Sequence, residues 1–271
     1  MRARKRFAQH FLEPAWVTKL VTAIDPAPGD AIVEIGPGRG AITLPLAARV
    51  AQLLAIEVDR DLAAALEARA LPNVTVVTAD VLSVDLAATV RTHLDQATVA
   101  RRRVVGNLPY NISSPILFRL LEAAPAAGFI DATLMLQEEV AERLIAVPGT
   151  GEYGVLTICT ALGADVTRLL SLPPGAFRPA PKVRSAVVRL AFRPPPAEVH
   201  DSTLVVAIVR AVFTQRRKTL ANALAPFVSS RGLRAADALE QAGIDPRRRP
   251  ETVSLAEYGR LAGVIGHPDK D

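Results

Sequence analysis

Residues 31–43 read AIVEIGPGRGAIT, an aliphatic run that ends in a loop with glycine at every second position. The aliphatic run predicts a buried strand over 31–36, and the residues after Gly40 predict a helix. Gly36 and Gly38 lie between the two, where the missing side chains let a ligand approach the backbone and the helix terminus supplies free N–H groups. This order predicts a βα unit of a parallel sheet that binds a ligand at its carboxyl edge.

Short aliphatic runs continue to alternate with longer helical patterns as far as about residue 192. Helical spacing fills the intervals, as in 60–70 and 138–146, and this alternation is typical of a mostly parallel sheet covered by helices. We therefore predict a doubly wound, Rossmann-like α/β fold whose strands are 31–36, 53–59, 74–80, 103–108, 132–137, about 166–172 and about 185–192.

The composition changes near Arg193, where three consecutive prolines follow at 194–196. A proline run is stiff and extended and cannot continue a helix, so it indicates a linker. From about residue 200 onward, apolar residues recur at helical spacing and no strand pattern is present. We predict a ligand-binding catalytic domain over 1–193 and a small all-α domain over 194–271.

The chain has 271 residues, half of them hydrophobic, and a formal net charge of +5. Its pI near 9.8 favours a polyanionic partner over an acidic small molecule. The only cysteine, Cys159, excludes a disulfide framework and a thiolate cluster, and indicates a reducing cytoplasm. Because the histidines are isolated and no apolar run is long enough to cross a bilayer, we expect no metal and no membrane partner.

Acidic residues occur at three of the predicted strands. Glu57 lies about 20 residues beyond the glycine loop, where an acid binds an adenosine ribose, so the loop predicts an adenosine-bearing cofactor without choosing between NAD and S-adenosylmethionine. Glu34 could face the amino-acid end of such a cofactor or orient the loop, and Asp80 could accept a hydrogen bond from its adenine. An acid at each strand is common in methyltransferases of this fold, which favours S-adenosylmethionine.

The tetrapeptide Asn107, Leu108, Pro109 and Tyr110 follows the fourth predicted strand and offers no nucleophile, no metal ligand and no group that titrates near neutrality. It suits a reaction at an exocyclic adenine amine, whose lone pair is delocalised into the ring. The Asn107 amide oxygen and the Leu108 carbonyl, held extended by Pro109, can accept the two amine hydrogens and leave the lone pair facing an electrophilic methyl group. The Tyr110 ring can stack on the base, which is worth about 1–3 kcal/mol.

Two plainer interpretations of these residues stay open. The tetrapeptide could simply close a strand with a proline turn and a helix cap at Ser113 or Ser114. The glycine loop could belong to an NAD oxidoreductase, although nothing in the sequence resembles a hydride-transfer acid and the tetrapeptide would then have no role.

Segments spread from Lys5 to Gly266 resemble the motifs of the KsgA/RsmA ribosomal RNA adenine dimethyltransferases. They are KRFAQHFL (5–12), VEIGPGRGAIT (33–43), IEVDRDL (56–62), TADVL (78–82), GNLPYNISSPIL (106–117), LQEEVAERL (136–144), YGVLTI (153–158), PPGAFRPAPKVRSAVVRL (173–190) and FTQRRKTLANAL (213–224).

The resemblance implies a seven-stranded S-adenosylmethionine-dependent methyltransferase fold with a C-terminal helical domain that assists rRNA binding. It implies dimethylation of N6 on two adjacent adenosines in a loop near the 3′ end of 16S rRNA. The substrate would be this rRNA within an immature or inactive small ribosomal subunit, with a role in subunit biogenesis. The protein would act as a cytoplasmic monomer.

The resemblance also assigns roles to single residues. Gly36 would lie in the cofactor loop with Gly38, Glu57 on the ribose, Asp80 on the cofactor adenine, and Asn107 where cofactor and target amine meet. In addition, His10 and Leu12 would contact the cofactor, and Phe177 would be the second ring that sandwiches the target adenine with Tyr110. The family usually has asparagine where this chain has His10, but an imidazole can donate or accept like an amide, so we expect binding to survive.

Two other functions are alternatives to small-subunit dimethylation, one with related chemistry and one with little catalysis. An Erm-type enzyme, which methylates one adenine of 23S rRNA, shares the glycine loop, the tetrapeptide and the aromatic motif, whereas QRRKTLANAL (215–224) favours the small-subunit enzyme. A subunit-assembly or RNA-binding factor with little catalytic role is the other, and the acids and Asn107 argue against it. The basic clusters 101–103, 216–218 and 247–249 are candidate phosphate contacts, although a solvated charge run is as common an explanation.

Overall fold

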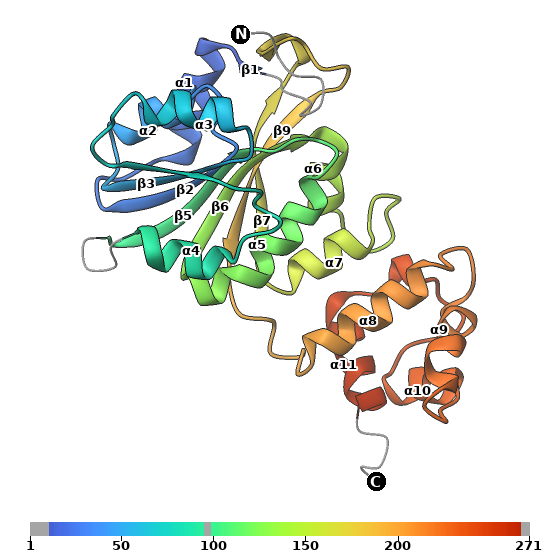
Figure 1. The fold of residues 1–271 in the computed structure, drawn as a ribbon. Coiled ribbons are helices and arrows are strands. Elements are labelled where there is room, and N and C mark those ends of the chain that lie inside the picture. The colour runs from blue at the N-terminus through green and yellow to red at the C-terminus, as the bar shows by residue number, and fades with distance from the viewer. Residues whose placement is uncertain (1–10, 95–98, 267–271) are drawn as a thin grey trace. The chain divides into compact units, whose positions relative to one another are not determined.

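The structure, a computed structural model, describes residues 11–94 and 99–266 (Figure 1). The chain forms two compact units. The first contains the chain up to Ala141 together with Asp165–Phe192, and the second contains Glu142–Ala164 and the chain from Arg193 onward.

A seven-stranded sheet forms the centre of the first unit (Figure 1). Its order is β4-β3-β2-β5-β6-β9-β7. Strands β2 to β6 pair in parallel and β9 pairs antiparallel to β6, so the predicted mostly parallel Rossmann-like sheet is confirmed. The strands are β2 (Asp30–Ile35), β3 (Gln52–Glu57), β4 (Val74–Thr78), β5 (Arg101–Asn107), β6 (Phe129–Gln137), β7 (Ala164–Leu172) and β9 (Ser185–Phe192).

Strand β2 lies between β3 and β5, and this neighbourhood sets the place of a binding site. Ile35, the last residue of β2, is the register partner of Ile56 on one side and of Gly106 on the other. The chain passes from β2 to its neighbour β3, and β5 lies on the other side of β2, so the carboxyl ends of three strands meet around one point. The predicted adjacency of the first and fourth strands is confirmed.

Helices of the first unit connect and cover these strands. Asp59 begins α3 by accepting hydrogen bonds from the N–H groups of Asp61 and Leu62 at 3.0 and 3.4 Å, an ordinary N-cap. The helices are α1 (Pro14–Ile24), α2 (Thr43–Ala47), α3 (Arg60–Glu67), α4 (Leu86–His93), α5 (Ser113–Ala127) and α6 (Glu138–Ile145), the last of which continues into the second unit.

A two-stranded antiparallel pair joins β1 (Phe11–Leu12) to β8 (Phe177–Arg178). Leu12 and Phe177 are register partners and both belong to a buried cluster with apolar residues of α1 and the sheet. Trp16 packs against the same cluster and carries the Lys19 ammonium 4.1 Å from its ring centroid.

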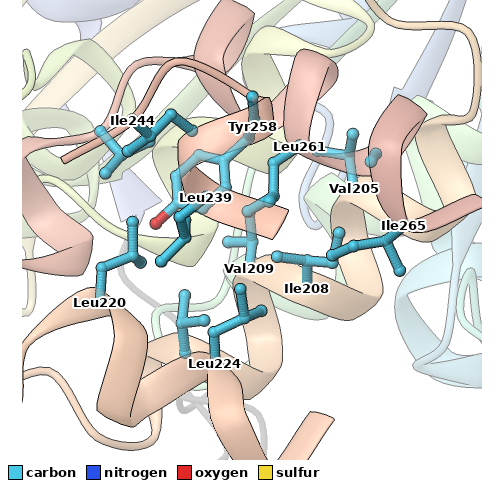
Figure 2. Close-up of a cluster of buried hydrophobic side chains, with 14 of the residues drawn as sticks. Val205, Ile208, Val209, Leu220, Leu224, Leu239, Ile244, Tyr258, Leu261 and Ile265 are labelled. Atoms are coloured by element: carbon cyan, nitrogen blue, oxygen red, sulfur yellow. The ribbon is translucent and has the colours of Figure 1, made fainter. Parts of the chain in front are cut away.

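The second unit is helical in its described residues. Its helices are α7 (Val155–Ala161), α8 (Ser202–Phe213), α9 (Leu220–Ser229), α10 (Ala235–Gln241) and α11 (Leu255–Gly266). Figure 2 shows their shared core, to which α8 contributes Val205 and Val209, α9 contributes Leu224, and α11 contributes Tyr258 and Leu261. The helical pattern over 204–228 is interrupted at 214–219, so it forms two helices rather than one.

The division between the units differs from a single cut after residue 193. The break at Arg193 lies beside the predicted boundary, but Glu142–Ala164 packs with the helices. The Tyr153 hydroxyl donates to the Val253 carbonyl at 2.9 Å, and the Gly149 N–H donates to the Glu251 carbonyl at 2.7 Å. These are long-range contacts, which local sequence patterns do not reveal. The division into a catalytic and an rRNA-binding domain stays a prediction.

The basic cluster 101–103 lies at the amino ends of the strands and is bound internally. Arg103 is 4% exposed and donates to both carboxylate oxygens of Asp131 at 2.8 Å and to Asp30 at 3.2 Å. Arg101 also donates to Asp30, which is fully buried, at 2.7 Å, and Arg102 donates to the Ala127 carbonyl at 3.2 Å. Arg103 is therefore held by internal partners and is not a free phosphate contact, whereas Arg101 stays 43% exposed beside Asp30.

A search of the described helices finds none that is both long enough and apolar enough to cross a membrane.

Candidate active site

A cavity of about 190 Å³ opens at the carboxyl ends of β2, β3, β4 and β5. The cavity is lined by the glycine loop, by an acid at the end of β3 and another just after β4, and by the tetrapeptide that begins at the end of β5. The lining residues are Leu12, Ile35, Gly36, Pro37, Gly38, Arg39, Ala41, Ile42, Ile56, Glu57, Val58, Ala79, Asp80, Val81, Asn107, Leu108, Pro109, Tyr110, Asn111, Ile112 and Ile116. Tertiary structure thus brings most of the predicted site residues to one place.

The glycine loop needs glycine for its backbone conformation. Gly36 has φ +67° and Gly38 has φ +57°, left-handed values that other residues rarely adopt. A Cβ atom at Gly36 would meet nothing within 4 Å, so the constraint there is the dihedral angle and the space in front of the residue is open. The Gly36 N–H donates to the Ile56 carbonyl at 2.9 Å, which fastens the loop to β3.

Glu57 connects the loop to the next helix. One carboxylate oxygen accepts the Gly38 N–H and the other accepts the Asp59 N–H, each at 2.9 Å. The side chain is 5% exposed yet still lines the cavity, and each oxygen keeps a lone pair for a ligand. Glu57 therefore fixes the shape of the loop as well as offering an acceptor to a ribose.

Asp80 follows β4, is exposed and lines the cavity. One of its carboxylate oxygens accepts the Leu82 N–H at 2.9 Å, a bond that orients the carboxylate. Val58 and Val81 flank the two acids and line the same cavity. Apolar walls with an acid at each end suit a flat base joined to a ribose.

Glu34 does not line the cavity, contrary to its prediction as a cofactor contact. It is 1% exposed inside β2, because the middle of a central parallel strand is covered on both faces. Burial raises the pKa of Glu34 to about 7, an effect that the Thr43 hydroxyl opposes and the Glu57 charge strengthens. One Glu34 carboxylate oxygen has no hydrogen-bond partner among the described residues. Orientation of the glycine loop, the second role considered for Glu34, stays a prediction.

The tetrapeptide lines the cavity with all four residues. The Leu108 N–H donates to the Met135 carbonyl at 3.1 Å, and the Leu108 side chain is 1% exposed, so the backbone here is held against β6. Gly106, just before Asn107, was missed by the sequence interpretation. A Cβ there would lie 2.9 Å from the Leu108 side chain and 3.1 Å from the Ile35 carbonyl, so only glycine lets β5 end this close to β2.

Tyr110 is half-buried and is held at two points. Its hydroxyl lies 2.6 Å from the Ser185 hydroxyl of β9, and its carbonyl accepts the Ser113 hydroxyl at 3.2 Å. Burial raises the pKa of Tyr110, so the phenol stays protonated at neutral pH. A helix cap at Ser113 or Ser114 was wrong, because Ile112 is the residue that precedes α5 and no side chain caps it.

Phe177 is fully buried in the cluster below β1 and β8 and does not line the cavity. Its predicted stacking role would require the ring to leave that cluster, because a ring without exposed faces cannot contact a base. Leu12 lines the cavity as predicted, while His10 lies outside the described residues.

Several lining residues had no signal of their own in the sequence. They are apolar or small residues beside the predicted ones, such as Ala41, Ile42, Ile112 and Ile116, and such residues occur in every helix core. Arg39, inside the glycine loop, and Val58, directly after Glu57, could have been found from their position beside a predicted contact.

The residues present fit S-adenosylmethionine. The open space in front of Gly36 suits the methionine part of the cofactor. The buried Glu57, which is bonded to the loop, suits its ribose, and the exposed Asp80 suits its adenine. Within 11–94 and 99–266, no group of three or more His, Cys, Asp or Glu residues could hold a metal ion.

Comparison with known proteins gives matches along nearly the whole chain. A family model described as ribosomal RNA adenine dimethylase matches residues 1–265. Ribosomal RNA small subunit methyltransferase A of Methylibium petroleiphilum is 48% identical over 262 residues, which are 96% of this chain and 95% of that protein. The protein of the same name from Acinetobacter baylyi is 45% identical over 268 residues, which are 96% of this chain and 92% of that protein.

Two crystal structures are similar over both units. That of a dimethyladenosine transferase from Plasmodium falciparum has a TM-score of 0.74 and 24% identity, and the match covers 96% of this chain and 98% of that one. That of the 23S rRNA methyltransferase ErmE has a TM-score of 0.67 and 28% identity, and covers 94% and 99%. The predicted methyltransferase fold with C-terminal helices is confirmed.

Proposed function

The chain belongs to the ribosomal RNA adenine dimethylase family, and we propose that the cavity at the carboxyl ends of β2, β3, β4 and β5 is its active site. The protein is an S-adenosylmethionine-dependent methyltransferase of rRNA adenines. The observation that carries the proposal is that Glu57, Asp80 and Asn107, from three strand ends, line one cavity with the glycine loop.

The cofactor side of the site would use the loop and the two acids. Gly36 and Gly38 would lie against the amino-acid part, Glu57 would accept hydrogen bonds from the ribose hydroxyls, and Asp80 would accept one from the adenine amine. When bound, S-adenosylmethionine supplies a methyl group that is already activated on a sulfonium. The protein therefore needs no strong base at this site, in agreement with the neutral tetrapeptide.

The target side would use the tetrapeptide. The Asn107 amide oxygen and the Leu108 carbonyl would accept the hydrogens of an adenine amine and keep its lone pair out of the ring. The Tyr110 ring would stack on the base. Correct orientation can lower a barrier by about 7–11 kcal/mol at best, so placement of the amine is the main contribution expected from these residues. A neutral amide also tolerates the loss of one N–H, so the same residues would serve a second methylation.

The target would be two adjacent adenosines near the 3′ end of 16S rRNA, within an immature or inactive small subunit. The names of the relatives from Methylibium petroleiphilum and Acinetobacter baylyi, which specify the small subunit, support this choice. The test is to incubate the full chain and labelled S-adenosylmethionine with small subunits that lack the modification, and to map the methyl groups. We expect two dimethylated adenosines, and label elsewhere or no label would reject the assignment.

The Erm-type alternative is favoured by one observation, the similarity to ErmE. Expression of the chain in a macrolide-sensitive strain separates the two enzymes. We expect sensitivity to be unchanged, whereas resistance would support 23S rRNA as the target. An assembly factor with little catalysis would instead be supported if an inactive Asn107 variant rescued the growth of a strain that lacks the enzyme.

RNA contacts of the second unit would come from exposed cations on two neighbouring loops. Arg217, Lys218 and Arg249 are exposed, and the Leu220 N–H donates to the Arg248 carbonyl at 2.6 Å, which joins the loops. Arg248 itself is bound by Glu257 and Thr252 inside the unit.

A salt titration of subunit binding tests these contacts. Replacement of Arg217 and Lys218 by Gln should lower the slope of log K against log salt by about 1–2, because each lost phosphate contact removes about 0.7–0.9. Arg234→Gln, at an 82% exposed position in the same unit, is the matched control. An unchanged slope in the double variant would remove this loop from the interface.

A further inference from the structure

Tyr110 is the only aromatic residue among the described residues that line the cavity. Phe177, which would supply a second ring, is fully buried elsewhere. The orientation of the Tyr110 ring therefore decides how a base is received at this rim. A hydrogen bond holds the ring in this orientation, because the Tyr110 hydroxyl bonds to a buried residue 75 positions further along the chain.

That partner is Ser185, whose hydroxyl lies 2.6 Å from the Tyr110 hydroxyl. Ser185 is the first residue of β9, is fully buried, and is the register partner of Gln137 at the end of β6. At the other end of Tyr110, the carbonyl accepts the hydroxyl of Ser113, which is 1% exposed. The Tyr110 carbonyl is thus bonded to α5 and the Tyr110 hydroxyl to β9. The residue is therefore held at its backbone and at the far end of its ring.

The residue that precedes β9, Arg184, is itself bound to Glu138 at the start of α6. The Glu138 N–H donates to the Arg184 carbonyl at 3.0 Å, and the Arg184 guanidinium lies 2.9 Å from the Glu138 carboxylate. Arg168 of β7 bonds to the same carboxylate. These contacts hold Arg184, the residue before Ser185, and keep the Ser185 hydroxyl from shifting with the mostly exposed loop 179–184.

We infer that Ser185 is a positioning residue, which sets the plane of the Tyr110 ring through the hydroxyl pair before the base arrives. This inference rests on the proposed function. A ring that is already oriented loses less conformational freedom when it stacks, and it presents the amine in line for the reaction. Ser185 does not line the cavity, so it acts through Tyr110 alone.

The test combines Ser185→Ala, Tyr110→Phe and the double variant in the full chain, with kcat and KM measured on small subunits that lack the modification. We expect Ser185→Ala to lower kcat about 3- to 10-fold, the effect of one hydrogen bond, with affinity for S-adenosylmethionine unchanged in calorimetry. The double variant should be no worse than the worse single variant, because both singles remove the same bond. Additive losses would overturn the inference.

Thr133→Val is the matched control, because it removes a buried strand hydroxyl of β6 that bonds to nothing in the described part of the chain. It should leave kcat unchanged. A loss of kcat in Thr133→Val equal to that in Ser185→Ala would show a general packing effect and would also overturn the inference.

A readout without turnover separates this inference from the proposed function. The chain has three tyrosines, so the ring signal of Tyr110 in carbon-13-labelled protein can be assigned by its absence in Tyr110→Phe. Ser185→Ala should shift or broaden that signal and leave those of Tyr153 and Tyr258 in place. An unmoved Tyr110 signal overturns the positioning role, whereas a wild type that methylates no subunit overturns the proposed function.

Discussion

The two ends of the parallel strands both carry charged and polar residues, yet they use them differently. At the amino ends, Arg103 is bonded to Asp131 and Asp30, and all three are buried. At the carboxyl ends, Glu57 and Asn107 line a cavity. Charges at the first end are buried against one another, whereas the polar residues at the second end border an open cavity.

The comparison shows that residue type does not identify a binding site. Three consecutive arginines at 101–103 are a stronger charge signal than one asparagine, but each of them donates to an internal partner, and Arg103 is buried by its partners. The direction of the strands explains the difference, because loops at the carboxyl ends diverge around the β2 switch point and leave space. The following variants test the two ends separately, from the largest expected effect to the smallest.

Arg103→Met should destabilise the first unit by about 3–5 kcal/mol, because it leaves the Asp131 carboxylate buried without its bidentate partner and removes one of the two arginines that bind Asp30. Urea unfolding of the full chain, followed by the fluorescence of Trp16, the single tryptophan, measures this loss. Arg91→Met, at an exposed position of α4, should change stability by less than about 0.5 kcal/mol. An Arg103 variant as stable as the wild type would contradict a structural role for the amino end.

Asn107→Ala should abolish methyl transfer, a loss of about 100-fold or more in kcat, because an acceptor that acts at the reacting amine is removed. Affinity for S-adenosylmethionine should stay largely intact, and calorimetry checks this together with the transfer of labelled methyl groups. Arg103→Met, assayed below its unfolding transition, is the comparison at the other end and should keep kcat. Turnover by Asn107→Ala at the wild-type rate would refute the role of this residue.

Glu34→Gln should change how the stability of the first unit depends on pH. The pKa of Glu34 is about 7 in the folded chain and 4.5 in the unfolded chain. The stability that protonated Glu34 allows is therefore fully present below pH 4.5 and is lost as the pH rises to about 7. We expect the wild type to lose roughly 3 kcal/mol more than Glu34→Gln between pH 4.5 and 7.5.

Urea unfolding at several pH values measures the difference, with Glu67→Gln, an exposed residue of α3, as control. Parallel pH profiles of the wild type and Glu34→Gln would show that Glu34 stays ionised when buried.

Glu57→Gln should weaken the binding of S-adenosylmethionine about 10-fold, because an amide keeps only one acceptor oxygen for the Gly38 N–H, the Asp59 N–H and the ribose. Calorimetric titration of the free enzyme measures the change. Equal affinity in the variant and the wild type would place the ribose elsewhere.

Local patterns predicted the strands well and placed Glu57 and Asp80 at strand ends that line the cavity, because aliphatic runs and glycine loops act over a few residues. They could not predict that Glu34 and Phe177 would be buried, because burial depends on neighbours far along the chain. Gly106 and Ser185 were missed for the same reason. Their importance comes from Ile35 and Tyr110, which are distant in the sequence.

The amino-acid sequence by itself determined the βα order, the glycine loop and the residue types that an adenine methyltransferase needs, because these depend on backbone preference and local periodicity. Only the tertiary structure decided which of them share one cavity and which arginines are available. Strand register brings Gly36, Glu57 and Asn107 together, and it closes Arg103 against Asp131 at the opposite edge. Pairing between distant strands is a property of the whole sheet, and no single segment contains it.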